Sequence, residues 1–184
     1  INKISKQGAF IPTNNPLDLA IQGNGFFQVA NPDGGTSFTR SGSFSLDGVG
    51  QVVDSSGNQL LPTINMPPNN NGISVSSEGQ IYAQTQNGPV FAGQIQLASF
   101  PNPDGLSPSG GNLFNESVAS GAPVLGIPGA GGYGTVLSGF LEGSNVDIAE
   151  EMVDQVISKA AFKANVNVIK TKDKMLGSLF DFKS

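Results

Sequence analysis

The chain changes character at Ser144-Asn-Val-Asp-Ile-Ala-Glu-Glu-Met-Val-Asp-Gln-Val-Ile157, and this stretch decides the fold. No glycine or proline follows Gly143 until Gly177, whereas residues 1–143 are crowded with Gly, Pro, Asn and Ser. Ser144 or Asn145 is suited to cap a helix, and four carboxylates follow within residues 147–154, where a helix dipole is positive. The sequence therefore predicts one long helix behind a domain of short strands and turns.

Apolar or small residues recur every three or four positions along this predicted helix, so they form one continuous stripe. The stripe runs through Ala149, Val153, Val156, Ala160, Ala164, Val168, Thr171, Met175 and Leu179. A helix of about 35 residues is roughly 50 Å long, too long for this domain to cover its stripe. We therefore predict a projecting helix whose stripe packs on other subunits as a coiled coil. The alternative is a shorter helix that breaks near residues 165–167 and folds back on the sheet.

The positions of the lysines and the alternation of apolar and polar residues add further detail to the predicted fold. Five lysines between residues 159 and 174 are interpreted as matching the negative end of the helix dipole. Before the helix, period-two alternation predicts strands in the segments 17–22, 26–29, 37–46, 51–54, 73–76, 80–83, 93–100 and 136–141. Gly23-Asn-Gly25 is interpreted as a hairpin turn between the first two strands.

The remaining β-domain segments are predicted from their turn and breaker residues. Residues 60–68 are expected to be an extended edge segment because they carry three prolines, and residues 101–134 are expected to be irregular loops. The predicted core is aromatic, with Phe26, Phe27, Phe38, Phe44, Phe91 and Phe100. Many short strands separated by regular turns predict a mainly β fold, an antiparallel sandwich or barrel-like domain with a long C-terminal α-helix. We expect an extended connector at 1–15, a β-rich outer domain at 16–143 and the helix at 144–184.

Composition excludes several classes of function. The chain has 184 residues with no Cys, His or Trp, so a zinc, haem or iron–sulfur site lacks its usual ligands and common nucleophiles lack their base. The net charge of -5 leaves no basic patch for nucleic acid. The sequence contains no run of about 18 apolar residues, so we expect no segment that spans a membrane. We expect no cofactor and no enzymatic activity.

Only a few polar residues invite a sharper interpretation. Arg40 is the single arginine and is predicted to lie within a strand. Its side chain is expected to lie on a solvated face, to form an ion pair with Asp18 or Asp47, or to contact another subunit. We therefore place Arg40 with the stripe residues as a candidate interface residue. Glu142, Glu150 and Glu151 are interpreted as helix-capping and dipole-matching groups rather than as catalytic carboxylates. The segment 47–54 lacks the ligand spacing of a calcium loop and is predicted to begin with a tight turn.

Several motifs in fixed order resemble the axial proteins of the bacterial flagellum, the rod and hook family. The resemblance covers nearly the whole chain and rests on Asn15-Pro-Leu-Asp-Leu-Ala-Ile-Gln-Gly-Asn-Gly-Phe-Phe-Gln-Val29, Phe38-Thr-Arg-Ser-Gly-Ser-Phe44, Gly50-Gln-Val-Val53, Gly93-Gln-Ile-Gln-Leu-Ala-Ser-Phe100, Gly111-Asn-Leu-Phe114, Ser120-Gly-Ala-Pro123 and Gly139-Phe-Leu-Glu-Gly-Ser-Asn-Val146. Residues 60–67 and 73–79 are most similar to the distal rod members. The chain departs from the family at Ser158-Lys-Ala-Ala-Phe162, where members tend to have Gln-Arg-Ala-Tyr. The family also has an N-terminal helix, and we expect residues 1–15 to be the connector that leads from such a segment.

This resemblance implies a structural subunit of the flagellar basal-body rod that self-assembles into a helical tube and transmits torque. Its implied partners are further copies of itself, other rod and hook proteins and the rings around the rod. The implied location is the periplasm-spanning rod, reached through the flagellar type III export system. A hook or proximal rod subunit is the alternative within the family. A carbohydrate-binding β-domain or a β-roll hydrolase is the alternative from another class, although the chain has only two tyrosines for stacking on sugars.

Overall fold

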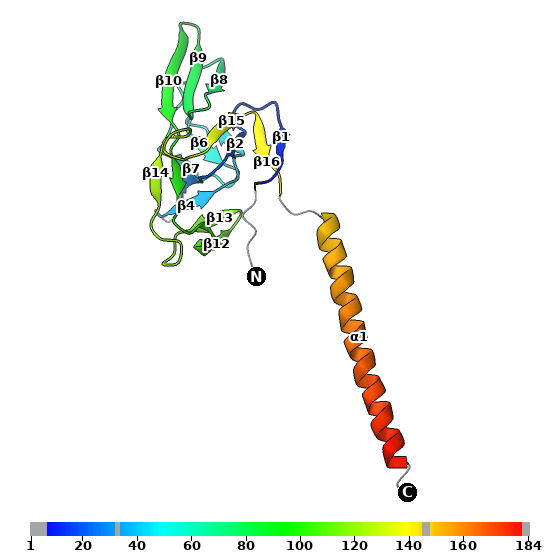
Figure 1. Cartoon of the computed structure of the whole chain (residues 1–184). Helices are drawn as coiled ribbons and strands as arrows, with labels where there is room; N and C mark the ends of the chain where they lie inside the picture. The colour runs from blue at the N-terminus through cyan, green and yellow to red at the C-terminus, as the bar shows by residue number, and fades with distance from the viewer. Residues whose placement is uncertain (1–6, 32–33, 145–147, 182–184) are drawn as a thin grey trace. The chain divides into compact units, whose positions relative to one another are not determined.

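The computed structural model describes residues 7–31, 34–144 and 148–181, without the side chains of residues 148–151, 154, 173 and 176–181. The chain forms two compact units, Ile1–Gly143 and Ser144–Ser184 (Figure 1). The first holds the strands β1 (Phe10–Pro12), β2 (Leu19–Gln22), β3 (Phe27–Ala30), β4 (Thr36–Thr39), β5 (Phe44–Leu46), β6 (Val52–Asp54), β7 (Gln59–Leu61), β8 (Gly72–Val75), β9 (Gln80–Thr85), β10 (Gly88–Gln94), β11 (Leu97–Ser99), β12 (Ser107–Gly110), β13 (Leu113–Asn115), β14 (Val124–Gly126), β15 (Thr135–Ser138) and β16 (Phe140–Glu142), and the short 3-10 helix η1 (Pro103–Gly105). The second holds α1 (Ile148–Asp181).

Antiparallel ladders build the first unit, which we call the β-unit. Its main sheet has the strand order β12-β13-β4-β3-β7-β6-β5, and β8, β9 and β10 form a second sheet. Three further pairs complete the fold: β1 with β16, β2 with β15, and β11 with β14. The predicted mainly β, sandwich-like fold with one long C-terminal helix is therefore confirmed.

One large and one small apolar cluster hold the β-unit together. The large cluster surrounds Phe27 and Phe44, whose rings meet edge to face with centroids 5.2 Å apart. The small cluster joins Phe38 and Phe100 with centroids 4.8 Å apart. The predicted aromatic core is wrong at one position, because Phe91 on the edge strand β10 is 55% exposed.

The turn at Gly23-Asn-Gly25 is not a hairpin, contrary to our prediction. β2 pairs with β15, whereas β3 pairs with β4 and β7, so the two strands on either side of this turn enter different sheets. Gly23 and Gly25 have φ angles of 112° and 134°, a region that favours glycine. These residues form a corner that carries the chain from one sheet to another.

The predicted strand at residues 37–46 is divided in two. β4 ends at Thr39 and β5 begins at Phe44. Within the gap, the carbonyl of Gly42 accepts a hydrogen bond from the amide of Leu19 at 2.8 Å. A Cβ atom on Gly42 would lie 1.6 Å from the carbonyl oxygen of Leu19. The gap therefore exists because the backbone of another strand approaches this position closely.

Three more segments correct the predicted strand pattern. β7 lies inside the main sheet between β3 and β6 rather than at an edge, because the strand ends before the first proline, Pro62. The predicted strand at 93–100 is shared between β10 and β11, and the one at 136–141 between β15 and β16. The region 101–134 is not irregular throughout, because it contributes β12, β13 and β14.

The tight turn predicted at Asp47 is confirmed. The Asp47 carboxylate accepts hydrogen bonds from the amides of Val49 (2.9 Å) and Gln51 (2.8 Å), which closes the connection between β5 and β6.

α1 is a single helix of 34 residues, so the alternative with a break near residues 165–167 is wrong. Its predicted caps include Asn145, which lies outside the described residues. The last turn of α1 contains no basic residue, and the nearest lysine within the helix, Lys174, is seven residues before its end at Asp181. Because dipole effects act within the first and last turns, our interpretation of the lysines as dipole-matching groups is wrong.

Candidate assembly surface and its anchor

The helical unit presents a long uncovered row of apolar side chains. Within this unit Val153, Val156, Val168 and Met175 are between 56% and 67% exposed. Ala160 and Ala164 are also exposed, and the side chains of Ala149 and Leu179 lie outside the described residues. A single helix cannot bury a stripe on itself, and an exposed apolar surface of this kind is typical of interaction sites. The assignment of these residues to a subunit interface remains a prediction.

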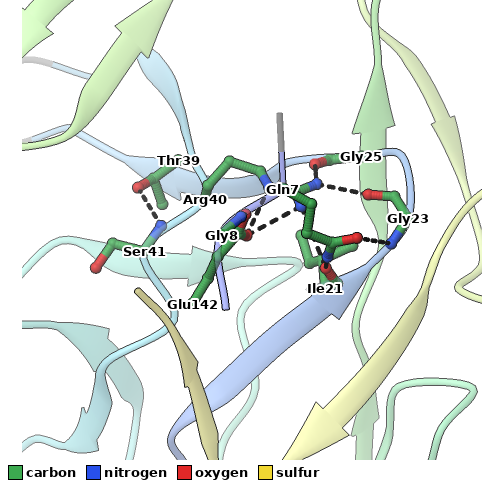
Figure 2. A network of polar contacts seen from close by, with 9 residues as sticks. All are labelled: Gln7, Gly8, Ile21, Gly23, Gly25, Thr39, Arg40, Ser41 and Glu142. Carbon is green, nitrogen blue, oxygen red and sulfur yellow. Dashed lines mark hydrogen bonds and ion pairs between the residues drawn. The ribbon is translucent and has the colours of Figure 1, made fainter. Parts of the chain in front are cut away.

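The β-unit contains a polar cluster with Arg40 at its centre (Figure 2). Arg40 follows β4 rather than lying within a strand. Its Nε donates to Glu142 Oε2 at 3.0 Å, and its Nη2 lies 2.9 Å from the same oxygen. The Arg40 and Glu142 side chains are 25% and 12% exposed, so this ion pair is largely shielded from water.

Backbone carbonyls take the remaining donors of Arg40. Nη1 donates to the carbonyls of Gly23 (2.8 Å) and Gly25 (2.7 Å), and Nη2 donates to that of Ile21 (3.2 Å). A guanidinium has five N–H donors in a fixed planar arrangement, and these contacts occupy all five. Arg40 therefore holds the corner between β2 and β3 against β16.

The N-terminal segment joins the same cluster. The amide of Gly8 donates to Glu142 Oε1 at 3.0 Å. The Gln7 side chain donates to the Ile21 carbonyl and accepts from the amide of Gly23 at 3.3 Å. Figure 2 shows Gln7, Gly8, Arg40 and Glu142 converging on one small volume. We call these four residues the clamp.

The clamp lies where the chain enters and leaves the β-unit. β1 and β16 pair with Phe10 opposite Glu142 and Pro12 opposite Phe140, and the amide of Gly143 donates to the Ala9 carbonyl at 2.8 Å. A Cβ atom on Gly8 would lie 1.9 Å from the Gly143 carbonyl oxygen, so the two backbones are in direct contact. The last residues of the β-unit before the helical unit are thus fixed by both a β ladder and the clamp.

Sequence reasoning found Arg40 but assigned the wrong ion-pair partners. Asp18 accepts from the Asn15 side chain, and the Asp47 carboxylate closes its own turn. Glu142, which we interpreted as a helix-capping group, lies in β16 and pairs with Arg40 instead. No local signal links the two, because they are 102 residues apart in sequence. Whether Arg40 also contacts another subunit remains a prediction, and its five donors are already engaged within the chain.

The described residues offer little that resembles a catalytic or ligand-binding centre. Among them no group of three or more potential metal ligands occurs. A shallow depression of about 320 Å³ contains Tyr133, but its hydroxyl donates to the Val124 carbonyl at 2.9 Å and its ring covers Gly126. Tyr133 is therefore a packing residue rather than a stacking platform.

The similarity of this chain to known proteins covers both the β-unit and the helical unit. The family model described as "Flagellar hook protein FlgE/F/G D1 domain" matches residues 20–83. A second, "Flagellar basal body rod FlgEFG protein C-terminal", matches residues 137–181. The chain belongs to the family of flagellar hook and basal-body rod proteins.

Individual relatives show where in this family the similarity is greatest. The "Flagellar basal-body rod protein FlgG" of Buchnera aphidicola subsp. Acyrthosiphon pisum is 42% identical over 96% of this chain and 69% of the relative. FlgG of Borreliella burgdorferi is 43% identical over 95% of this chain and 68% of the relative. The "Flagellar hook protein FlgE" of Rhizobium meliloti is 38% identical, over 65% of this chain and only 30% of the relative. The resemblance seen in the sequence motifs is thus confirmed, and the prediction that the chain is not an enzyme is confirmed by this family.

Proposed function

We propose that this chain is a structural subunit of the distal rod in the bacterial flagellar basal body. The observation that carries the proposal is the 42% identity to a basal-body rod protein across 96% of the chain, which includes both the β-unit and α1. The similarity to a hook protein covers less of both chains, so the rod subunit is preferred over the hook subunit. Self-assembly into a helical tube follows from contacts between unlike surfaces, which extend into a filament when they do not close into a ring.

In this tube, α1 supplies the contacts between subunits and the β-unit supplies a stiff wall. Torque that reaches the helix has to pass through the exit strand β16 into the β-unit. The clamp fixes β16 to the β2–β3 corner through Arg40 and to the N-terminal segment through Gly8. Charge-assisted hydrogen bonds in a shielded site are stronger than neutral ones, so this connection resists shear.

The partners that we propose are further copies of this chain, other rod and hook proteins and the rings that surround the rod. Export through the flagellar type III system is part of the same proposal. No helix in the described ranges combines the length and hydrophobicity that crossing a bilayer requires. A carbohydrate-binding function finds no support in the fold, because Tyr133 is used for packing and Tyr82 contacts the Phe91 ring at 5.6 Å.

Immunoelectron microscopy of purified hook–basal bodies from the source cell tests this function. Antibody raised against residues 16–128 should label the shaft that crosses the envelope. Label confined to the curved segment outside the cell would make the chain a hook subunit. Particles without any label, from cells shown to produce the protein, would contradict an axial role.

A further inference from the structure

β10 is an open edge of the second sheet. Among the described strands it pairs with β9 alone, and it is the outermost strand in the order β10-β9-β8. It is 7 residues long, and the side chains of Val90 and Phe91 are 47% and 55% exposed. Figure 1 shows β9 and β10 extending beyond the other strands of the β-unit. The backbone groups on the outer side of such a strand offer hydrogen bonds to any further strand that approaches.

The sequence around β10 favours pairing of this kind. Residues 79–103, which contain β9, β10 and β11, carry no charged side chain. Charged side chains on an edge strand, lysine above all, are a common protection against pairing with another chain. Segments with high β propensity and low charge aggregate readily unless a charge or a proline interrupts them. The edge of β10 therefore lacks electrostatic protection, but its sequence contains one proline, Pro89.

The ladder between β9 and β10 directs the nitrogen of Pro89 away from β9. Pro89 lies opposite Gln84, whose carbonyl accepts from the amide of Asn71 at 2.7 Å, on the β8 side of β9. In an antiparallel ladder, pairs of residues that bond to each other alternate with pairs whose polar groups point outward. Gln84 thus directs its polar groups toward β8, and Pro89 directs its own toward the open edge. At this outward position the chain has no N–H to donate.

Proline occupies an edge in two other places in the β-unit. Of the described strands, only β1, β10 and β12 contain proline, and each of them has a neighbour on one side only. The Ala9 carbonyl and the Thr13 amide bond to the chain on either side of β16 at 2.8 and 2.7 Å, so Pro12, at the alternate position, faces away from β16. Pro108 lies on β12, the outermost strand of the main sheet. Hydrogen bonding excludes proline from central strands, but it does not require proline at an edge.

We propose that Pro89 is a gatekeeper residue, which keeps the β10 edge of one copy of this chain from pairing with the β10 edge of a second copy. In a symmetric antiparallel pair of β10 strands, residue 89 of each copy would face residue 91 of the other. The two prolines remove the bonds that residue 89 would donate, about half of the bonds between the copies. Pro12 and Pro108 protect β1 and β12 in the same way. Copies of the chain therefore pack closely through other surfaces without fusion of their sheets.

Sedimentation equilibrium of the purified chain tests this role. P89T restores the outward N–H and introduces a residue with high β propensity, so the association constant should rise by about tenfold or more, equivalent to roughly 1.4 kcal/mol. P101T is the matched control, because it makes the same change at an exposed proline outside the strands, and it should leave the association constant unchanged. Any association through α1 is common to these variants, so their ratio reports on the substituted position.

A charged side chain on the same edge should take over the function of the proline. P89T/F91K places a lysine at the other outward position of β10, so the association constant should return to within about threefold of its original value. Tyr82 and Tyr133 report on folding of the β-unit, and each variant should keep the original urea midpoint of tyrosine fluorescence. P89A restores the N–H with a smaller side chain and replaces P89T in the comparison if P89T does not fold.

Three results would overturn the proposal. The first is an association constant for folded P89T or P89A equal to that of the unsubstituted chain. The second is an equal rise in P101T, and the third is a rise in P89T that F91K does not reverse, because association would then not run through the β10 edge. The measurement uses the purified chain, so each of these results leaves the rod function standing.

Discussion

Replacement of Arg40 by alanine is the most direct test of the clamp. The change removes the ion pair with Glu142 and the hydrogen bonds that Arg40 donates to the carbonyls of Gly23 and Gly25, whereas the Ile21 carbonyl keeps its hydrogen bond from Gln7. Breaking a buried ion pair costs about 3–5 kcal/mol, and exposure of 25% at Arg40 allows water to recover part of that loss. We expect the free energy of unfolding of the β-unit to fall by about 3 kcal/mol.

The two tyrosines make this loss measurable for the β-unit alone. Tyr82 and Tyr133 both lie in the first unit, so tyrosine fluorescence during urea unfolding does not report on α1. With a urea dependence of about 2 kcal/mol per molar, the midpoint for R40A should fall by about 1.5 M. R40K should fall by a smaller amount, because an ammonium group retains the charge but cannot form the planar set of five contacts.

The urea midpoints of two further variants, E78A and R40A/E142A, serve as controls for R40A. E78A removes an exposed carboxylate of the β-unit and should leave the midpoint unchanged. The combined variant R40A/E142A should lose less than the sum of R40A and E142A, because the second change removes a partner that is already unpaired. An R40A midpoint within about 0.3 M of the unsubstituted protein would refute the clamp as a stabilising element.

The same tyrosine measurement checks two further predictions about the β-unit. G42A should prevent folding or cost more than about 3 kcal/mol, because the new Cβ would lie 1.6 Å from the Leu19 carbonyl oxygen, whereas G48A meets nothing within 4 Å and should unfold near the original midpoint. F27A should cost about 3–5 kcal/mol, because Phe27 is fully buried and meets the Phe44 ring. A cost below about 1 kcal/mol for either G42A or F27A would show that the local structure adjusts more freely than the packing indicates.

Local sequence patterns predicted the elements whose causes are local. The absence of glycine and proline between 144 and 176, together with the apolar period, predicted the helix that the structure shows as α1. The alternation in 17–22 predicted the buried strand β2. The Asp47 turn was predictable because its stabilising hydrogen bonds lie within four residues.

Pairing between strands was not predictable in the same way, because it depends on contacts that are distant in sequence. Gly23 and Gly25 have the composition of a hairpin turn, yet Leu19 of β2 pairs with Ser138 and Phe27 of β3 pairs with Thr39. The division between β4 and β5 depends on the approach of the Leu19 backbone to Gly42, which alternation alone does not reveal.

Local sequence patterns predicted one part of the candidate site, and contacts between distant residues determine the other part. The stripe on α1 followed from periodicity, because a helix converts sequence spacing directly into a surface. The partner of Arg40 did not, because Glu142 is 102 residues away in sequence and lies on β16, whose position depends on its pairing with the distant strand β1. The role of Arg40 is thus explained by its contacts in the clamp rather than by the sequence around it.

Incorporation of a stripe variant into the flagellum tests the central claim that α1 assembles the subunits. V156E/A160E places two carboxylates in the stripe, while Q155E/S158E adds the same charge on the opposite side of the helix, and all four side chains are exposed in the helical unit. We predict that V156E/A160E is produced, shows the original urea midpoint by tyrosine fluorescence and is absent from purified basal bodies, whereas Q155E/S158E is incorporated. Normal incorporation of V156E/A160E would contradict the claim.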